Sequence, residues 1–164
     1  MIIHLKKKKI LKVGDFSFKC SIGKKGISKK KLEGDKKTPK GSFNLQHLYY
    51  RKDRINIPLN TKIKKIAIKK DMGWCDDINS KKYNKLINRN EKYKHEKMYR
   101  RDNKYDLLIP IKFNFKKPKK NLGSCIFMHL TKNYLPTAGC IALQKKDFLI
   151  LLKLINKNSK IVIH

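Results

Sequence analysis

The sequence predicts a β-rich mixed α/β fold with one C-terminal helix. Most apolar residues fall in short runs separated by Lys, Gly, Asn or Pro, a pattern typical of strands. Only residues 144–156 repeat their apolar side chains at the spacing of an amphipathic helix. The length of 164 residues fits one domain, which we expect to span residues 1–164.

The N-terminal region contains three short apolar or alternating runs, at residues 2–5, 10–13 and 16–21. We expect the first to be a strand and the other two to form a hairpin whose turn includes Gly14. The alternation in the third run predicts one shared face for Phe16, Phe18 and Cys20. Cys20 is therefore expected to be a small core residue.

Residues 23–41 show no periodicity and predict a long loop, after which Phe43 resumes extended structure. A loop of this length inside a compact domain usually has a function. We therefore expect it to form a wall of the active site rather than a plain surface connection.

The middle of the chain alternates predicted strands with an irregular insert. Residues 63–68 and 105–115 are apolar enough for strands, and Pro110 in the second favours a sheet edge or a bulge. Residues 73–102 between them are rich in Asn, Lys and Tyr, and we expect an irregular insert with a short helix near residues 91–101. Trp74 is expected to anchor this insert against the sheet.

The segment with the strongest chemical signal runs from Gly123 to Leu143. It holds two apolar runs that predict buried strands, joined by a polar, turn-prone segment. His129 lies near the end of the first run and Cys140 directly before the second. A thiol becomes a nucleophile when an imidazole can take its proton, and Gly139 allows a tight turn that aims N–H groups at an oxyanion.

These residues resemble the YkuD-type L,D-transpeptidases, whose hallmark is a His followed, after a loop, by Ser/Thr-x-Gly-Cys. Here the hallmark is His129 and then Thr137-Ala138-Gly139-Cys140. Residues 33–41, Glu-Gly-Asp-Lys-Lys-Thr-Pro-Lys-Gly, also look like the G-D-x-x-T-P-x-G segment of the family.

The chain departs from the commoner members at two positions of the hallmark. They have a second His at the place of Ala138 and an Arg at the place of Ala142, and the loop between His and Cys is shorter here. A branch of the family shares these departures, together with four segments also present in this chain: Tyr-Tyr-Arg at 49–51, Gly-Trp-Cys-Asp-Asp at 73–77, Tyr-Asn at 83–84 and His-Glu at 95–96.

The resemblance implies a YkuD-like β-sandwich and a cysteine acyltransferase that cross-links peptidoglycan stem peptides, without a cofactor. It makes Cys140 the nucleophile, His129 the base, and the N–H groups of Gly139 and Cys140 the oxyanion donors. With water as the acceptor, the same chemistry gives an L,D-carboxypeptidase. The sequence offers no obvious acidic partner for His129, and the resemblance implies that a backbone carbonyl can orient its ring.

Three residues are further expected to bind substrate: Thr137, Ser124 and Arg51. A guanidinium can hold a peptide carboxylate through two hydrogen bonds. For the segment around Arg51, however, packing of an aromatic ring and pairing of Arg with Asp is the favoured interpretation.

Two other classes of function are open to the sequence. Cys125, His129 and Cys140 offer three zinc ligands, but no C-x-x-C pair or fourth ligand accompanies them, so we expect no metal site. A basic nucleic-acid-binding protein without catalysis would fit the charge, but none of the usual motifs is present, and we expect no specific nucleic acid as a partner.

The charge and the N-terminus bear on where the protein acts. Lys and Arg total 43 against 12 acidic residues, a net charge of +31. Most of the basic residues are Lys, as expected for AT-rich codons, yet the charge would attract anionic surfaces at low salt. The first ten residues show no signal-peptide core, whereas the family resemblance implies a periplasmic or cell-wall-facing location.

Overall fold

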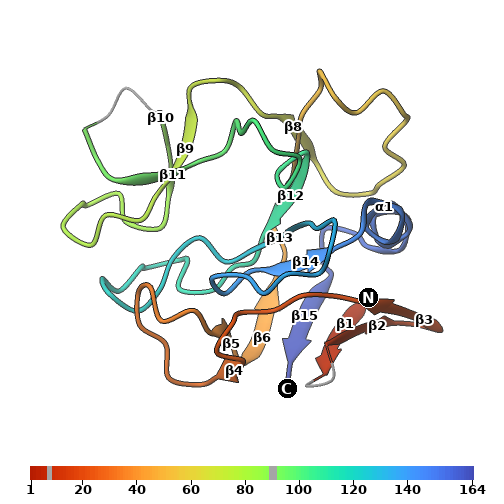
Figure 1. Cartoon of the computed structure of the whole chain (residues 1–164), viewed down its shortest axis with the longest axis horizontal. Coiled ribbons are helices and arrows are strands. Elements are labelled where there is room, and N and C mark those ends of the chain that lie inside the picture. The colour runs from red at the N-terminus through yellow and green to blue at the C-terminus, as the bar shows by residue number, and fades with distance from the viewer. Residues whose placement is uncertain (7–8, 89–91) are drawn as a thin grey trace.

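The predicted β-rich fold with one C-terminal helix is confirmed in a computed structural model, which describes residues 1–6, 9–88 and 92–164 (Figure 1). Two five-stranded sheets make up most of the structure, and a three-stranded sheet and a two-stranded pair complete it. The helix lies beside the sheets, near the N-terminal strands (Figure 1).

The first sheet joins the two ends of the chain. Its strand order is β3-β2-β1-β15-β6, with β1 and β15 parallel. The strands are β1 (Ile2–Lys6), β2 (Ile10–Val13), β3 (Phe16–Lys19), β6 (Gly41–Asn44) and β15 (Lys160–Ile163). The predicted hairpin of β2 and β3 forms, with Gly14 in its turn at a φ of 53°. Phe18 and Cys20 are buried as expected, but Phe16 is exposed because it lies at the outer end of the edge strand β3.

The second sheet carries the residues of the predicted site. Its order is β14-β13-β12-β7-β8. The strands are β7 (Leu48–Tyr50), β8 (Lys65–Ala67), β12 (Leu107–Pro110), β13 (Phe127–Leu130) and β14 (Ile141–Leu143). The expectation that Pro110 marks a sheet edge is wrong, because β12 lies between β13 and β7, and Pro110 pairs with Phe127. The alternative expectation, a bulge, agrees with a one-residue shift of register between the pairs Leu108–Tyr49 and Ile111–Leu45. A proline is tolerated at such an irregular position because it has no N–H to donate, and the ladder with β13 continues past it through the N–H of Ile111, which donates to the carbonyl of Ile126 at 2.9 Å.

The insert is more regular than predicted. It contains the antiparallel sheet β10-β9-β11, formed by β9 (Met72–Cys75), β10 (Leu86–Asn88) and β11 (His95–Lys97). The short helix expected near residues 91–101 does not form over its described part, which includes β11, and residue 91 lies outside the described residues. Trp74 anchors the insert as expected: its ring meets Phe127 of β13 edge to face at 5.4 Å, and its Nε1 donates to Asn84 Oδ1 at 2.9 Å.

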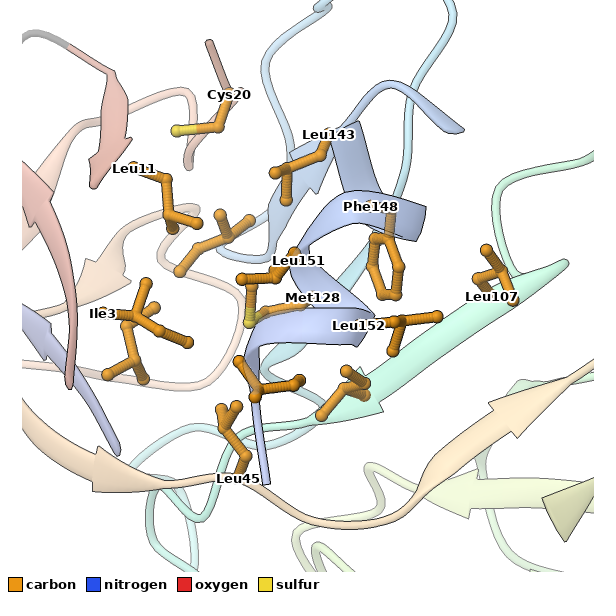
Figure 2. Close-up of a cluster of buried hydrophobic side chains, with 14 of the residues drawn as sticks. Ile3, Leu11, Cys20, Leu45, Leu107, Met128, Leu143, Phe148, Leu151 and Leu152 are labelled. Atoms are coloured by element: carbon orange, nitrogen blue, oxygen red, sulfur yellow. The ribbon is translucent and has the colours of Figure 1, made fainter. Parts of the chain in front are cut away.

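The core lies between the two large sheets and is closed by the helix α1 (Lys145–Leu154) (Figure 2). Phe148, Leu151 and Leu152 form the buried face of α1, which confirms the helical spacing seen in the sequence. They pack with Ile3 and Leu11 of the first sheet and with Leu107 and Met128 of the second. Among the described residues, no helix combines the length and apolarity needed to cross a bilayer.

Strand β13 is buried on both of its faces. Met128 and Leu130 belong to the main core, whereas Phe127 belongs to a second apolar cluster that also holds Trp74, Tyr105 and Leu108. Side chains alternate along a strand, so His129 lies on the same face as Phe127. Burial on two sides explains why residues 125–130 form a nearly continuous apolar run instead of an alternating one.

Two phenylalanines that differ in burial, Phe148 and Phe16, give a direct test of where the core lies. Phe148→Ala is expected to lower the free energy of unfolding by about 3–5 kcal/mol, because Phe148 is fully buried and the helix cannot close the cavity. Phe16→Ala removes the same group from a ring that is 45% exposed and is expected to change this free energy by less than about 1 kcal/mol. Urea unfolding of both variants measures the difference, and equal losses would contradict the assigned core.

Candidate active site

The pairing of β13 with β14 brings the two predicted catalytic residues onto one face. The strands run parallel, with His129 beside Ala142. Cys140 precedes Ala142 by two residues and therefore points to the same side. Both His129 and Cys140 line a cavity of about 660 Å³, as do Thr137 and Ala138. A two-way bridge between Ser21 and Ala142 covers the outer edge of β14, with N···O distances of 2.8 and 3.0 Å.

His129 is held as a neutral imidazole with a defined orientation. It is 7% exposed, and this burial lowers its pKa to about 4. Its Nδ1 lies 2.9 Å from the carbonyl oxygen of Leu130, which can only accept, so Nδ1 carries the proton. The orienting backbone carbonyl that we expected is thus present. The ring of Tyr105 packs edge to face on the imidazole at 5.4 Å. The geometry leaves Nε2 with a lone pair that can accept a proton.

The thiol of Cys140 is also neutral at rest. Burial raises its pKa to about 12. Its Sγ donates to the carbonyl oxygen of Cys125 at 3.1 Å, and the N–H of Phe127 donates to the sulfur at 3.4 Å. The second contact favours the thiolate form, because an N–H donor stabilises negative charge on sulfur. The site therefore pairs a neutral thiol with a neutral base and places one N–H beside the sulfur.

The turn before Cys140 is shaped by the hydroxyl of Thr137. It donates to the carbonyl of Cys140 at 2.6 Å and accepts from the N–H of Gly139 at 3.1 Å. In this structure the predicted oxyanion donor Gly139 is thus engaged by Thr137, and the Thr137 hydroxyl itself is engaged within the turn. Thr137 was expected to bind substrate, and it does line the cavity. Its bonds within the turn follow the usual side-chain-to-backbone pattern of Thr.

Glycine at position 139 is required by a close approach of the loop at residues 23–41. Its φ is 138°, and a Cβ there would lie 2.7 Å from the carbonyl oxygen of Lys37. Thr38 Oγ1 donates to the Gly139 carbonyl at 2.9 Å and accepts from the N–H of Gly23 at 2.9 Å. Within this loop, the short strands β4 (Ile27–Ser28) and β5 (Thr38–Pro39) pair in parallel. The loop is therefore attached to the turn that carries the thiol. None of its described residues lines the cavity of Cys140 and His129, so it supports that turn and does not form the expected wall of the cavity.

Ser124 lies outside the cavity that holds Cys140 and His129. Its side chain is buried, and its Oγ donates to Glu33 Oε2 at 2.7 Å. The hydroxyl of Tyr83 donates to the same oxygen of Glu33. Glu33 of the long loop thus connects Ser124 to the insert, which carries Tyr83.

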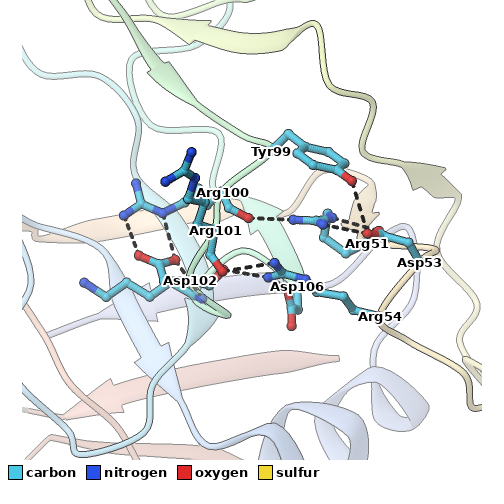
Figure 3. A network of polar contacts seen from close by, with 9 residues as sticks. Arg51, Asp53, Arg54, Tyr99, Arg100, Arg101, Asp102 and Asp106 are labelled. Carbon is cyan, nitrogen blue, oxygen red and sulfur yellow. Dashed lines mark hydrogen bonds and ion pairs between the residues drawn. The ribbon is translucent and has the colours of Figure 1, made fainter.

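Arg51 has its donors occupied within the protein and also lies outside this cavity (Figure 3). Its Nε and Nη2 donate to the two oxygens of Asp53 at 2.8 and 2.6 Å, and its Nη1 donates to the carbonyl of Arg100 at 2.7 Å. The guanidinium lies over the ring of Tyr99 at 3.6 Å. This confirms the favoured interpretation of the segment, aromatic packing and an Arg–Asp pair.

The cavity also contains charged residues that the sequence analysis did not place among the expected site residues. Glu96 of β11 and Arg100 line it, and Arg100 Nη1 donates to Glu96 Oε1 at 2.8 Å. Asp102 holds Arg100 from the other side through Nε and Nη2, at 2.9 and 2.7 Å (Figure 3). The His-Glu segment at 95–96 was the sequence signal that could have pointed to Glu96 as a site residue. The position of Glu96 in the cavity depends on the pairing of β11 with β9, which sets Glu96 opposite Trp74.

The three residues considered for zinc do not converge as ligands. In residues 1–6, 9–88 and 92–164, no three His, Cys, Asp or Glu side chains form a group that could hold a metal ion. The thiol of Cys125 faces the carbonyl of Trp74 at 3.8 Å, and that of Cys140 faces the carbonyl of Cys125.

The buried imidazole makes stability depend on pH. Because the pKa of His129 is about 4 in the folded chain and 6.5 when unperturbed, the unfolded chain binds this proton first as the pH falls. The free energy of unfolding should therefore lose about 2–3 kcal/mol from this residue between pH 7 and pH 4.5. Urea unfolding of the wild type and of His129→Asn at both pH values isolates the effect, since other groups titrate alike in both. Equal losses in the two proteins would contradict a neutral buried His129.

Comparisons with known proteins were made for the sequence and for the fold. A family model described as YkuD, L,D-transpeptidase catalytic domain, matches residues 2–163. No curated protein sequence matches the chain at a significant level. Among solved structures, Bd1075 of Bdellovibrio bacteriovorus is similar with a TM-score of 0.50 and 16% identity, over 99% of this chain and 47% of that one.

The helical cell shape determining protein Pgp2 of Campylobacter jejuni is similar with a TM-score of 0.53 and 17% identity, over 99% of this chain and 46% of that one. A crystal structure of its K307A mutant has a TM-score of 0.54 and 18% identity, with the same coverage. This chain therefore spans just under half the length of these solved chains. Their similarity confirms the YkuD-like fold, and the match over residues 2–163 shows that the chain belongs to the YkuD family of L,D-transpeptidase catalytic domains.

Proposed function

We propose that the chain, acting as one catalytic domain, is an L,D-transpeptidase that uses Cys140 as its nucleophile on peptidoglycan stem peptides. The observation that carries the proposal is the shared cavity of Cys140 and His129 in a chain of this family. The family is one of peptidoglycan-modifying enzymes, and this makes a non-catalytic nucleic-acid-binding protein the weaker interpretation of the +31 charge.

Acylation would begin with a neutral pair. As Sγ of Cys140 attacks the carbonyl carbon between an L-residue and a D-residue, its proton passes to Nε2 of His129. Transfer in step with attack suits this site, because burial disfavours both the thiolate and the imidazolium before substrate arrives. The imidazolium then protonates the leaving amine of the D-residue, the C–N bond breaks, and a thioester remains on Cys140.

The tetrahedral oxyanion needs N–H donors near Cys140. The N–H of Cys140 is the first candidate. The N–H of Gly139 could add a second bond only by leaving the hydroxyl of Thr137, which accepts it in the resting turn. Thr137 would then act as a positioning residue, holding the Gly139–Cys140 turn until substrate is bound.

Deacylation decides between the two activities considered. An amine acceptor attacks the thioester carbon, passes its proton through His129 to the departing sulfur, and leaves a cross-link. Water in the same position gives an L,D-carboxypeptidase.

Activity on stem peptides would place the domain on the cell-wall side of the membrane, in the periplasm of a diderm cell. Pgp2, to which the chain is similar in fold, is a cell shape determining protein.

Mass spectrometry of the intact protein after incubation with a carbapenem tests the nucleophile. The wild type is expected to gain the mass of one ring-opened carbapenem, because a β-lactam traps an activated thiol as an acyl-enzyme. Cys140→Ala should form no adduct and should lower kcat/KM on stem peptides by about 10³-fold or more.

The matched control is Cys125→Ala. It removes the neighbouring thiol but keeps the backbone carbonyl that accepts from Cys140, so its adduct should persist. An adduct that survives Cys140→Ala, or a well-folded wild type that never reacts, would rule out Cys140 as the nucleophile.

A further inference from the structure

Three carboxylates of the cavity, those of Glu96, Asp102 and Asp106, differ in their hydrogen-bond partners. Asp106 is buried, and its Oδ1 accepts from Arg54 at 3.1 Å. Asp102 uses both oxygens for Arg100. Glu96 uses only Oε1, which accepts from Arg100 at 2.8 Å and from the hydroxyl of Tyr105 at 3.2 Å. From the described residues, Oε2 of Glu96 accepts no hydrogen bond, and the side chain is 32% exposed.

Glu96 is held in place from two directions. Arg100 fixes it from the chain that follows β11, and Tyr105 fixes it from the start of β12. The ring of Tyr105 also packs against His129, so Tyr105 contacts both Glu96 and the proposed base. A carboxylate fixed in this way loses little side-chain entropy when a ligand binds to its second oxygen.

The local charge is negative in a strongly basic protein. When ionised, Glu96 and Asp102 outweigh Arg100 by one negative charge, although the whole chain carries +31. Three further cations, Lys104, Lys132 and Lys145, also line the cavity, and Lys104 belongs to the same segment as Asp102. A small cation would be attracted to the group of Glu96 and Asp102 and repelled by these lysines.

We propose that Glu96 is the subsite for a primary ammonium group of the peptide substrate. A compact ammonium has three donors and fits one free carboxylate oxygen beside an already occupied guanidinium. The inference rests on the proposed function and adds to it the recognition of an amine. The amine has two sources: a side chain of the donor peptide, or the acceptor that resolves the acyl-enzyme.

If the acceptor is the source, the bound ammonium first releases one proton to water. Its nitrogen then attacks the thioester carbon, the C–S bond breaks, and the second proton passes through His129 to the sulfur of Cys140. Glu96 binds the amine in either case and forms no covalent bond.

Glu96→Gln is the variant that isolates the charge. The Gln carbonyl oxygen can still accept from Arg100 and Tyr105, so the wall of the cavity is retained. Asp15→Asn is the matched control, because it removes the same charge from the exposed turn between β2 and β3. Unchanged thermal unfolding verifies that each variant is folded.

The first arm measures binding without turnover. Two tetrapeptides that end in D-alanine, with L-lysine or L-norleucine as the penultimate residue, are titrated calorimetrically into Cys140→Ala. If the donor supplies the amine, the lysine peptide should bind about tenfold tighter despite the +31 charge, and adding Glu96→Gln should abolish that preference while adding Asp15→Asn should not.

The second arm measures the fate of the acyl-enzyme. With the norleucine peptide as donor and an added peptide that has one free amino group as acceptor, the ratio of aminolysis to hydrolysis is read by mass spectrometry. If the acceptor supplies the amine, this ratio should fall about tenfold in Glu96→Gln and stay unchanged in Asp15→Asn.

A lysine preference in the first arm assigns Glu96 to the donor, and a changed ratio in the second assigns it to the acceptor. No effect of Glu96→Gln in either arm overturns the proposal. A wild type that turns over neither peptide and forms no carbapenem adduct refutes the proposed function. In that case the binding measurement alone tests the Glu96 subsite, and equal affinities for the lysine and norleucine peptides overturn it.

Discussion

The parallel pairing of β13 with β14 is the constraint on which the site depends. It aligns His129 with Ala142, and so places Cys140 on the face of the sheet from which His129 projects. A shift of one residue would turn the thiol toward the core, because side chains alternate along a strand. The register is secured from both sides: the alternate residues Met128 and Leu130 are buried in the main core, and Ser21 bridges the free edge of β14.

The insert gives the same sheet its second buried face, and with it the electrostatics of the site. Trp74 and Tyr105 pack on Phe127, and Tyr105 also packs on His129, so water is excluded from the imidazole. Exclusion of water lowers the pKa of His129 and raises that of the Cys140 thiol. The Cys140 thiol and the His129 imidazole are therefore both uncharged in the resting site. Reactivity then depends on the alignment of these two groups and not on a preformed thiolate.

The charges of the protein are organised most closely around this insert. Arg51, Arg54 and Arg100 are each engaged by a carboxylate and by backbone carbonyls or an aromatic ring (Figure 3). These bonds tie the segment 99–106 to β7 and its following turn, and so hold Tyr105 between Glu96 and His129. An Arg can do this where Lys cannot, because its planar fork makes several bonds at once. Most of the lysines, in contrast, lie on the surface.

Local patterns in the sequence were sufficient for the elements whose signal is local. They predicted the N-terminal hairpin, the apolar runs of β13 and β14, the helix that buries Phe148, and the nearness of His129 to Cys140, which rested on the motif as well. They missed the sheet of the insert, whose strands are three or four residues long and are stabilised by pairing with one another. The pairing of Arg51 with Asp was already the favoured interpretation of its segment. Only the tertiary structure decided that Thr137 holds the turn, that Ser124 binds Glu33, and that Glu96 reaches the cavity. The physical reason is that periodicity and turn chemistry are properties of neighbouring residues, whereas the contacts of Ser124 and Glu96 join segments far apart in the chain and depend on strand register. The partners of Thr137 are close in sequence, but which of many possible partners it engages is decided by competition in the folded chain.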